Sequence, residues 1–558
     1  MEEFPRLGLE FLGKCSYDPS SPNRIYFSIG EAIAAIAIFI AFTQLLRPMI
    51  TFRLSNSPFK LQTAYKLFFV AIFSVFAAAI VPFIPGNPLP LLGYPVFWEI
   101  LAGFLFVIGA LGFIWTINRY AKLNNSNYKQ YLRGCTLLIG KGKEDDLSEL
   151  ADEIYESIPE VLMACKKFDR DAKIFAKREG KEYELSEYTN YTLTLLDVWS
   201  DEKFCRILVC TAPKTIIYFF QKIEEYKIYS SGGNAFVNQI IRQAFLNKSS
   251  ILHREEDFYG LGHFKTFTKA VFGNYELIES FYRPLQAWDY WRDDNLEPWK
   301  VKKYVQCLNI AIKSYFSSRI RDFGYPAALF SAYDVCEHIS MIESIKLDKA
   351  NEDEIYNVTA FNNLMEVSKG LEESISIVNK YEGLIPQCEI EEKNYNKYKD
   401  FSIYGVIANG IYGFYKSLSI ARQHDTAVRM IAIGLWLKIY PVSDELETIA
   451  IKEIQKRLNL HLIRKVEENL EKLYYPAITR LLISILGLWI QEYKEEKKGE
   501  LFFKDKFIEL IKKHYKKAED QDSQKAKDMI PDSVSYDKEG GRLIQKTPFG
   551  NEYILDLR

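Results

Sequence analysis

The chain has 558 residues, more than one hydrophobic core usually organises, so several structural units are expected. Charged residues make up 26% and hydrophobic residues 48%, as in an ordinary globular protein. The net charge of −2 argues against bulk electrostatic binding to nucleic acid or lipid, so any such site would be a local basic patch.

Three hydrophobic segments lie close together near the N-terminus, at 26–46, 67–84 and 94–117. Each has 18–24 residues, enough to cross about 30 Å of hydrocarbon as a helix. They predict a three-helix transmembrane domain at 26–118 after an extracytoplasmic tail at 1–25. Three buried helices of a soluble core are the alternative, and a cleaved signal peptide is not expected because Glu2, Glu3 and Glu10 precede the first segment.

Basic residues predict the orientation of these spans. The loop after the first span carries Arg47, Arg53, Lys60 and Lys66, and the loop after the second, PGNPLPLLG, carries none. Basic residues return after the third span, from Arg119 onward. We therefore expect a multi-pass plasma-membrane protein with its N-terminus outside and the large C-terminal region in the cytosol. Arg6, Lys14 and Arg24 in the tail oppose this orientation slightly.

Two carboxylates fall inside the predicted spans, Glu31 in the first and Glu99 in the third. A charge in a bilayer is costly unless it faces water or a partner, so these residues indicate either an acidic ring at the mouth of a cation pore or side chains that reach the headgroup layer. Ala34 and Ala41 lie on a face of small residues that could line a constriction or allow close helix packing. Three helices cannot enclose a water path, so a pore requires a homo-oligomer, for which a tetramer is favoured.

The rest of the chain is predicted to be mainly α-helical. A polar neck at 119–145 should contain a short strand or turn and then a helix, and helical periodicity then dominates a cytosolic sensor domain at 146–518 without a fixed-period repeat. Residues 519–558 should form a charged linker followed by two or three antiparallel strands, and docking of these strands on their own domain is the simplest expectation.

The most distinctive stretch runs from 229 to 304, and it combines aromatic and basic side chains as a nucleotide or single-stranded nucleic-acid site would. A structural cluster at a subunit interface is the alternative. Within the stretch, the HREED run at 253–257 could form a carboxylate–histidine site, although a solvated loop is favoured. The candidate ligand-binding residues are Arg254, Lys265, Lys269, Arg283, Trp288, Trp291, Arg292, Lys302 and Lys303.

Motifs that would indicate catalysis or a metal are missing from the sequence. GxSxG, HExxH and GxGxxG do not occur, and none of the eight cysteines forms a CxxC pair. We therefore expect no enzyme activity, no cofactor and no metal site, with the cysteines as reduced thiols. Three functions remain: a ligand-gated channel, a membrane-anchored enzyme, and a scaffold.

The architecture as a whole, a short group of spans followed by a large helical region, resembles the membrane effectors of bacterial anti-phage systems. The size and the aromatic–basic segment 282–304 are similar to the channel effector of Hailong defence. The resemblance implies a bacterial inner-membrane channel that kills the infected cell. It also implies a nucleotidyltransferase partner whose single-stranded DNA oligomers bind the cytosolic domain and hold the channel shut. The sequence alone is equally compatible with a ligand that opens the channel.

Overall fold

A computed structural model describes the protein at residues 37, 47–57, 61–80, 95–166, 185–228, 234–257, 266–281, 285, 296–318, 326–351, 355–356, 358–384, 402–441, 447–472, 477–488, 498–546 and 552–557. The chain divides into two compact units, Met1–Gly140 and Lys141–Arg558. The described part is mainly helical with one small C-terminal sheet, as the sequence predicts.

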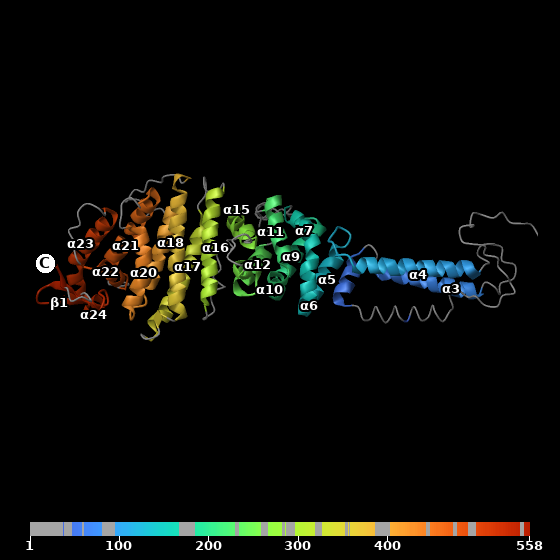
Figure 1. The fold of residues 1–558 in the computed structure, drawn as a ribbon, viewed down its shortest axis with the longest axis horizontal. Helices are drawn as coiled ribbons and strands as arrows, with labels where there is room; N and C mark the ends of the chain where they lie inside the picture. The colour runs from blue at the N-terminus through green and yellow to red at the C-terminus, as the bar shows by residue number, and fades with distance from the viewer. Residues whose placement is uncertain are drawn as a thin grey trace, which may run out of the picture. The chain divides into compact units, whose positions relative to one another are not determined.

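Unit 1 contains four described helices: α2 (Pro48–Asn56), α3 (Leu61–Ile80), α4 (Pro95–Ile117) and α5 (Tyr128–Lys141). Helices α3 and α4 lie side by side as an antiparallel hairpin (Figure 1). The direction follows from its contacts, because Ser57, just before α3, reaches Thr116 near the end of α4, whereas Phe68 meets Phe106 further along.

The predicted spans are confirmed in part. Among the described residues, one helix, Phe97–Ile117, is long and apolar enough to cross a membrane, and it coincides with the third predicted span. Helix α3 begins at Leu61, six residues before the predicted second span, and its apolar part, Tyr65–Ala77, is shorter than a span. Apart from Ala37, which is helical, the first span lies outside the described residues.

The predicted strand or turn in the neck is wrong, because that segment forms helix α5. Tyr131, Cys135 and Leu138 are buried at spacings of four and three residues, which is the helical period. Gly134 of this helix faces the Phe52 ring of α2, and a Cβ at Gly134 would lie 2.4 Å from that ring. Close packing of α2 on α5 therefore depends on this glycine.

Unit 2 is a succession of helices followed by strands. Its described helices are α6 (Glu144–Glu153), η3 (Ile154–Ser157), α7 (Ile158–Lys166), α9 (Glu187–Trp199), α10 (Glu202–Thr211), α11 (Pro213–Tyr226), α12 (Asn234–Leu246), α13 (Ile251–Asp257), α14 (Thr266–Phe272), α15 (Tyr275–Ser280), α16 (Pro298–Ser317), α17 (Ala327–Asp348), α18 (Thr359–Lys380), η7 (Glu382–Leu384), α19 (Ile403–Leu418), α20 (Asp425–Ile439), α21 (Ile449–Lys472), α22 (Ala477–Leu486), α23 (Lys498–Gln521) and α24 (Ser523–Lys527). Several begin at a side-chain cap, such as Ser186, Asp201 or Ser402.

Helices α16 to α23 form two layers. Each helix packs chiefly on the second helix after it, so α16, α18, α20 and α22 make one layer and α17, α19, α21 and α23 the other (Figure 1). Glycines allow the closest approaches, since Gly370 of α18 faces Val305 of α16 and Gly410 of α19 faces Tyr333 of α17. The helix starts are unevenly spaced along the chain, which is why no fixed repeat is visible in the sequence.

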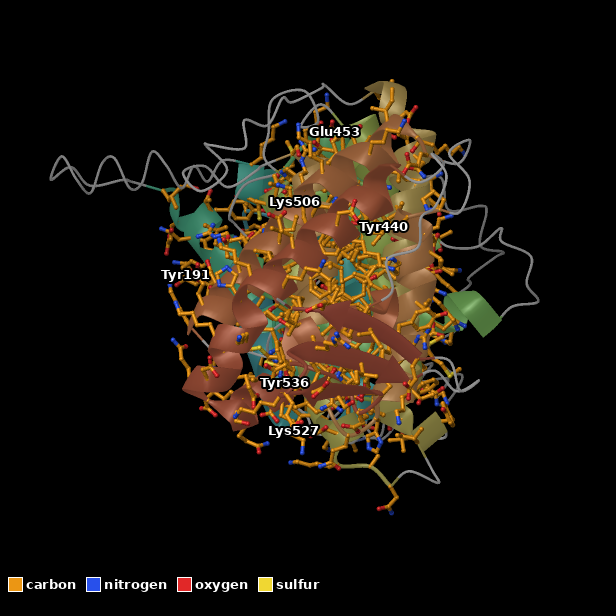
Figure 2. All side chains as sticks on the ribbon, turned by 90° about the vertical axis from the view of Figure 1, so that its left-hand side faces the viewer. Tyr191, Tyr440, Glu453, Lys506, Lys527 and Tyr536 are labelled. Atoms are coloured by element: carbon orange, nitrogen blue, oxygen red, sulfur yellow. The ribbon has the colours of Figure 1, made fainter. Side chains whose placement is uncertain are left out.

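The C-terminal strands β1 (Val534–Asp537), β2 (Arg542–Lys546) and β3 (Glu552–Asp556) form an antiparallel sheet in that order. The sheet docks on its own unit, as expected. The side-chain Oε1 of Gln545 accepts a hydrogen bond from the Leu488 N–H, 2.7 Å away, and Tyr536 packs edge-on against Tyr515. Figure 2 looks onto these strands, with Tyr536 labelled.

The charged linker predicted after residue 518 is wrong, because α23 continues to Gln521 and α24 follows at once. The side chain of Asp522 accepts a hydrogen bond from the Lys525 N–H and so caps α24. Ala518 and Ala526 are buried, which anchors both helices despite the charged residues around them.

Candidate functional site

The interior of the α3–α4 hairpin is made largely by small side chains. Ala71 and Val75 of α3 pack against Ala102 of α4, and all three are at most 6% exposed. The Phe68 ring also fits against α4 because Gly109 has no side chain, and a Cβ there would lie 3.3 Å from the ring. Small residues at a helix contact are typical of helices that associate in lipid, where apolar burial supplies no driving force.

The outward faces of the same hairpin carry large apolar side chains. Phe69 of α3 is 71% exposed and Phe104 of α4 is 62% exposed. Other exposed side chains continue this surface along both helices: Tyr65, Val70, Phe73, Phe76, Phe97, Ile100, Val107, Ile108, Leu111, Ile114 and Trp115. Soluble proteins expose single apolar residues freely, but a continuous surface of this kind indicates contact with lipid or with another protein.

At its C-terminal end, α4 passes from apolar to basic and aromatic residues. The Arg119 guanidinium lies over the Trp115 ring, 4.2 Å from its centroid, and Arg53 lies 5.4 Å from the centroid of Tyr120. Arg53 also donates a hydrogen bond from Nη1 to the Ile117 carbonyl, at 2.7 Å. Aromatic and basic residues at the end of an apolar helix are typical of a membrane–water interface.

Of the four pore-lining candidates, the structure describes Glu99 alone; Glu31, Ala34 and Ala41 lie outside the described residues. Glu99 lies in the second turn of α4, and its side chain is 9% exposed. In a single chain it is therefore covered and does not belong to the exposed apolar face. Whether it joins a ring with Glu31 stays a prediction.

The HREED run lies in helix α13, and the side chains of His253 and Glu255 have separate structural roles. Glu255 accepts hydrogen bonds from the Phe267 and Thr268 N–H groups and so caps the start of α14. His253 is buried, with its Nε2 3.1 Å from the Phe245 carbonyl and its ring edge-on to Trp299. The favoured solvated loop is wrong, because the run lies in helix α13, and among the described side chains His253 and Glu255 bind different partners rather than each other.

The described ligand-binding candidates lie on α13, α14 and α16. Arg254, Lys269 and Lys302 are exposed, and Arg254 donates to the Cys210 carbonyl at 2.6 Å. Lys303 is 3% exposed, so burial argues against its predicted contact with a ligand. The remaining candidates lie outside the described residues: Lys265, Arg283, Trp288, Trp291 and Arg292.

One group of side chains that the sequence analysis missed could hold a cation. Ligand atoms of Glu467 and Glu471 on α21 and of His514 on α23 lie within 4.8 Å of one another. The two glutamates are four residues apart on one helix face, but their histidine partner is more than forty residues away in sequence, so no local motif marks the group.

The described cysteines are free thiols, as expected. Burial raises the pKa of Cys165 to about 12 and raises that of Cys210, although Arg254 and Arg206 oppose the shift at Cys210. Thiolates are the reactive form, so these thiols are poorly suited to nucleophilic chemistry at neutral pH.

Comparisons with protein-family models, with curated proteins and with solved structures found no match to this chain. Among the described residues, the exposed apolar surface of the α3–α4 hairpin is the most distinctive chemical feature.

Proposed function

We propose that this protein is a membrane-embedded homo-oligomer whose α3–α4 hairpin crosses the bilayer together with the segment 26–46, and that it acts as an ion channel gated by a cytosolic ligand. The observation that carries the membrane part is the exposed apolar surface of the hairpin. Most of its large side chains point outward, Phe68 and Phe113 excepted, and small ones line much of its interior, which is the arrangement that a lipid solvent favours.

The dimensions and charges of α4 support insertion. Its 23 residues give a helix of about 35 Å, against about 30 Å of hydrocarbon. No charged residue occurs from Ile100 to Ile117, and basic residues follow immediately. In the proposed arrangement, the positive-inside rule favours the cytosolic side of a bacterial inner membrane for the C-terminal end of α4 and the chain after it.

Conduction is supported by Glu99 and by the number of spans. A carboxylate inside a membrane helix is costly unless water or a partner compensates it, and three spans per chain can line a water path only as several copies, with four favoured. The ligand would be anionic, a nucleotide or a single-stranded DNA oligomer made by a nucleotidyltransferase partner. Exposed Arg254, Lys269 and Lys302 are its candidate contacts. Its loss or arrival would then open the channel and kill an infected cell.

A second candidate is a membrane-anchored enzyme or scaffold, in which the spans only locate the helical unit. The covered side chain of Glu99 favours it, because a pore-lining carboxylate should face away from its own chain. The two functions differ in whether Glu99 affects ion flux.

Two measurements test the proposal. Alkaline carbonate extraction should leave the wild-type chain in the membrane fraction, and release into the supernatant would overturn membrane insertion. Ion flux into proteoliposomes should fall at least severalfold in Glu99→Gln and further in the Glu31→Gln/Glu99→Gln double variant. Glu509→Gln, an exposed carboxylate on α23, is the matched control. Flux in the double variant equal to wild type would favour the anchor.

The oligomer and the ligand need a separate measurement. Native mass spectrometry of the purified chain should show several copies, and extraction of the same sample should release a short oligonucleotide or a nucleotide. A monomer without nucleic acid would overturn the gated-oligomer part of the proposal while leaving membrane insertion untouched.

A further inference from the structure

A cavity of about 190 Å³ lies in unit 1 where α2 and α4 both end. Its walls come from the last turn of α2, the last turn of α4 and the chain that follows α4 as far as Asn124. One water needs about 10–15 Å³ of such space, so the cavity has room for a group of several heavy atoms.

Three basic side chains line this cavity: Arg53, Arg119 and Lys122. Arg119 is held over Trp115, and Arg53 is held by the Ile117 carbonyl at the end of α4. That hydrogen bond also engages a carbonyl whose negative dipole would otherwise oppose an anion. These contacts hold the Arg53 and Arg119 side chains at the wall of the cavity.

The sequence around the cavity is rich in basic residues and poor in acidic ones. From 32 to 143 the sequence contains one carboxylate, Glu99, which lies near the opposite end of α4. The same range contains ten basic residues, namely Arg47, Arg53, Lys60, Lys66, Arg119, Lys122, Lys129, Arg133, Lys141 and Lys143. This local excess of positive charge favours an anionic ligand at the cavity.

Polar side chains fix the wall of the cavity. Asn127 is 6% exposed and donates from Nδ2 to the Asn56 carbonyl at 3.1 Å and to the Lys122 carbonyl at 2.9 Å. It thereby ties the end of α2 to the chain after α4. Thr116 adds a second link through its hydroxyl, 3.2 Å from that of Ser57.

Asn56 adds an unsatisfied acceptor to the cavity lining. Its side chain is 5% exposed, and its Oδ1 has no hydrogen-bond partner among the residues that the structure describes. A buried oxygen left in this state costs about 1–3 kcal/mol, so a donor from a bound molecule would stabilise it. A headgroup that carries a hydroxyl beside its phosphate would satisfy both the cations and this oxygen.

We infer that the cavity is a binding site for the phosphodiester headgroup of an anionic phospholipid, with Arg53, Arg119 and Lys122 contacting the phosphate. The inference rests on the proposed membrane insertion, which brings the end of α4 to the headgroup layer. An occupant at this position joins α2 to α4, so bound lipid would also stabilise the base of the hairpin.

The test compares lipid retention in two matched variants of the full chain. Arg119→Gln/Lys122→Gln removes two charges from the cavity, whereas Lys129→Gln/Arg133→Gln removes two exposed charges from α5 outside it. Each protein is reconstituted in nanodiscs that contain 20% phosphatidylglycerol (roughly a bacterial proportion of anionic lipid) and released for native mass spectrometry. We expect the cavity variant to retain at least about fivefold less phosphatidylglycerol, which corresponds to about 1 kcal/mol, and the α5 variant to match wild type.

Three outcomes would overturn the inference. Equal losses in both variants would mean that the basic segment attracts anionic lipid without a specific site. No loss in either would mean that the cavity does not bind lipid. Inorganic phosphate that binds the protein in phosphatidylcholine nanodiscs, and competes away bound phosphatidylglycerol at millimolar concentration, would identify a free anion as the occupant.

Controls separate these results from misfolding and from failure of the proposed function. Arg119→Lys keeps the charge and should retain lipid, and the melting temperature of each variant is measured in phosphatidylcholine alone. Carbonate extraction of wild type reports insertion independently. A chain that inserts but shows no site-specific retention refutes the lipid site and leaves the proposed function standing.

Discussion

Helices α4 and α22 are both strongly apolar, yet their side chains are distributed in opposite ways. In α22 the largest side chains, such as Leu481 and Leu482, are buried, and the partly exposed positions are Arg480 and Ser484. In α4 the buried positions include Ala102 and Gly109, whereas its phenylalanines and leucines include exposed members. The pattern of α22 is the one that surrounding water favours, and the pattern of α4 is the one expected under the proposed membrane insertion.

The difference shows that apolar composition does not identify a membrane helix. In water, burying large side chains supplies most of the stabilisation, so they gather at helix contacts. In lipid, the outside is as apolar as the inside, and close contact between small residues holds helices together. The following predictions test whether α4 and α22 really belong to these two classes.

The largest expected effect is a charge placed in α22. Leu482 is fully buried, so Leu482→Asp should lower the free energy of unfolding by about 4 kcal/mol or more. Phe104→Asp, on the exposed face of α4, should instead weaken membrane insertion by about 2.5–3.5 kcal/mol and leave unit 2 folded. Thermal melting followed by circular dichroism in detergent, with carbonate extraction, measures both. If Phe104→Asp abolished the melting transition of unit 2, the contrast between α4 and α22 would be contradicted.

Substitution of two glycines in unit 2 should change its stability by an intermediate amount. A Cβ at Gly370 would lie 1.7 Å from Cγ1 of Val305, so Gly370→Ala should destabilise unit 2 by about 1–3 kcal/mol through overpacking. Gly434 is exposed on α20, and a Cβ there would meet only the end of the Glu372 side chain at 3.1 Å. Gly434→Ala should therefore raise stability by up to about 1 kcal/mol. If both variants changed the free energy of unfolding in the same direction, the helix contacts would differ from those described.

Much of unit 2 was predictable because many of its helices are amphipathic. The pattern at 359–381 predicts α18, which runs from Thr359 to Lys380, and the pattern at 425–438 predicts α20 within one residue at its end. Short helices such as α13 were missed, since seven residues give less than two turns of periodicity. The pattern at 476–497 predicts a longer helix than α22, which ends at Leu486 because Gly487 has a φ of 69°, although apolar residues continue in the sequence.

The candidate site was less predictable, because residue type does not reveal which partner a side chain takes. Glu255 is a helix cap for a segment eleven residues away, and Lys303 differs from its neighbour Lys302 only in the direction it faces on α16. The basic cavity combines residues more than sixty positions apart, Arg53 with Arg119 and Lys122. Tertiary packing alone brings such residues together.

A smaller effect is expected where glycines contact α3. A Cβ at Gly109 would lie 3.3 Å from the Phe68 ring, whereas a Cβ at Gly103 would meet nothing within 4 Å. Gly109→Leu should therefore loosen the hairpin by about 1–2 kcal/mol, and Gly103→Leu should be nearly neutral. Hydrogen exchange in nanodiscs should become faster in α3 and α4 for the first variant only. Equal exchange in both variants would place the helix contact elsewhere.

The smallest effect is expected at Glu372, a half-buried carboxylate of α18. Burial is the main cause that raises the pKa of Glu372, and Lys438 acts against it. A raised acid pKa means that the folded state disfavours the charged form, so the penalty is present at pH 7 and disappears as the pH falls toward 4. Glu372→Gln should therefore stabilise unit 2 slightly at pH 7, by less than about 1 kcal/mol because the group is half exposed.

Melting temperatures at pH 7 and pH 4 measure the gain from Glu372→Gln, with Glu509→Gln on the exposed face of α23 as the control. The advantage of the variant over wild type should shrink at the lower pH, since wild-type Glu372 is then protonated and uncharged as well. A variant less stable than wild type at pH 7 would mean that attraction to Lys438 outweighs burial.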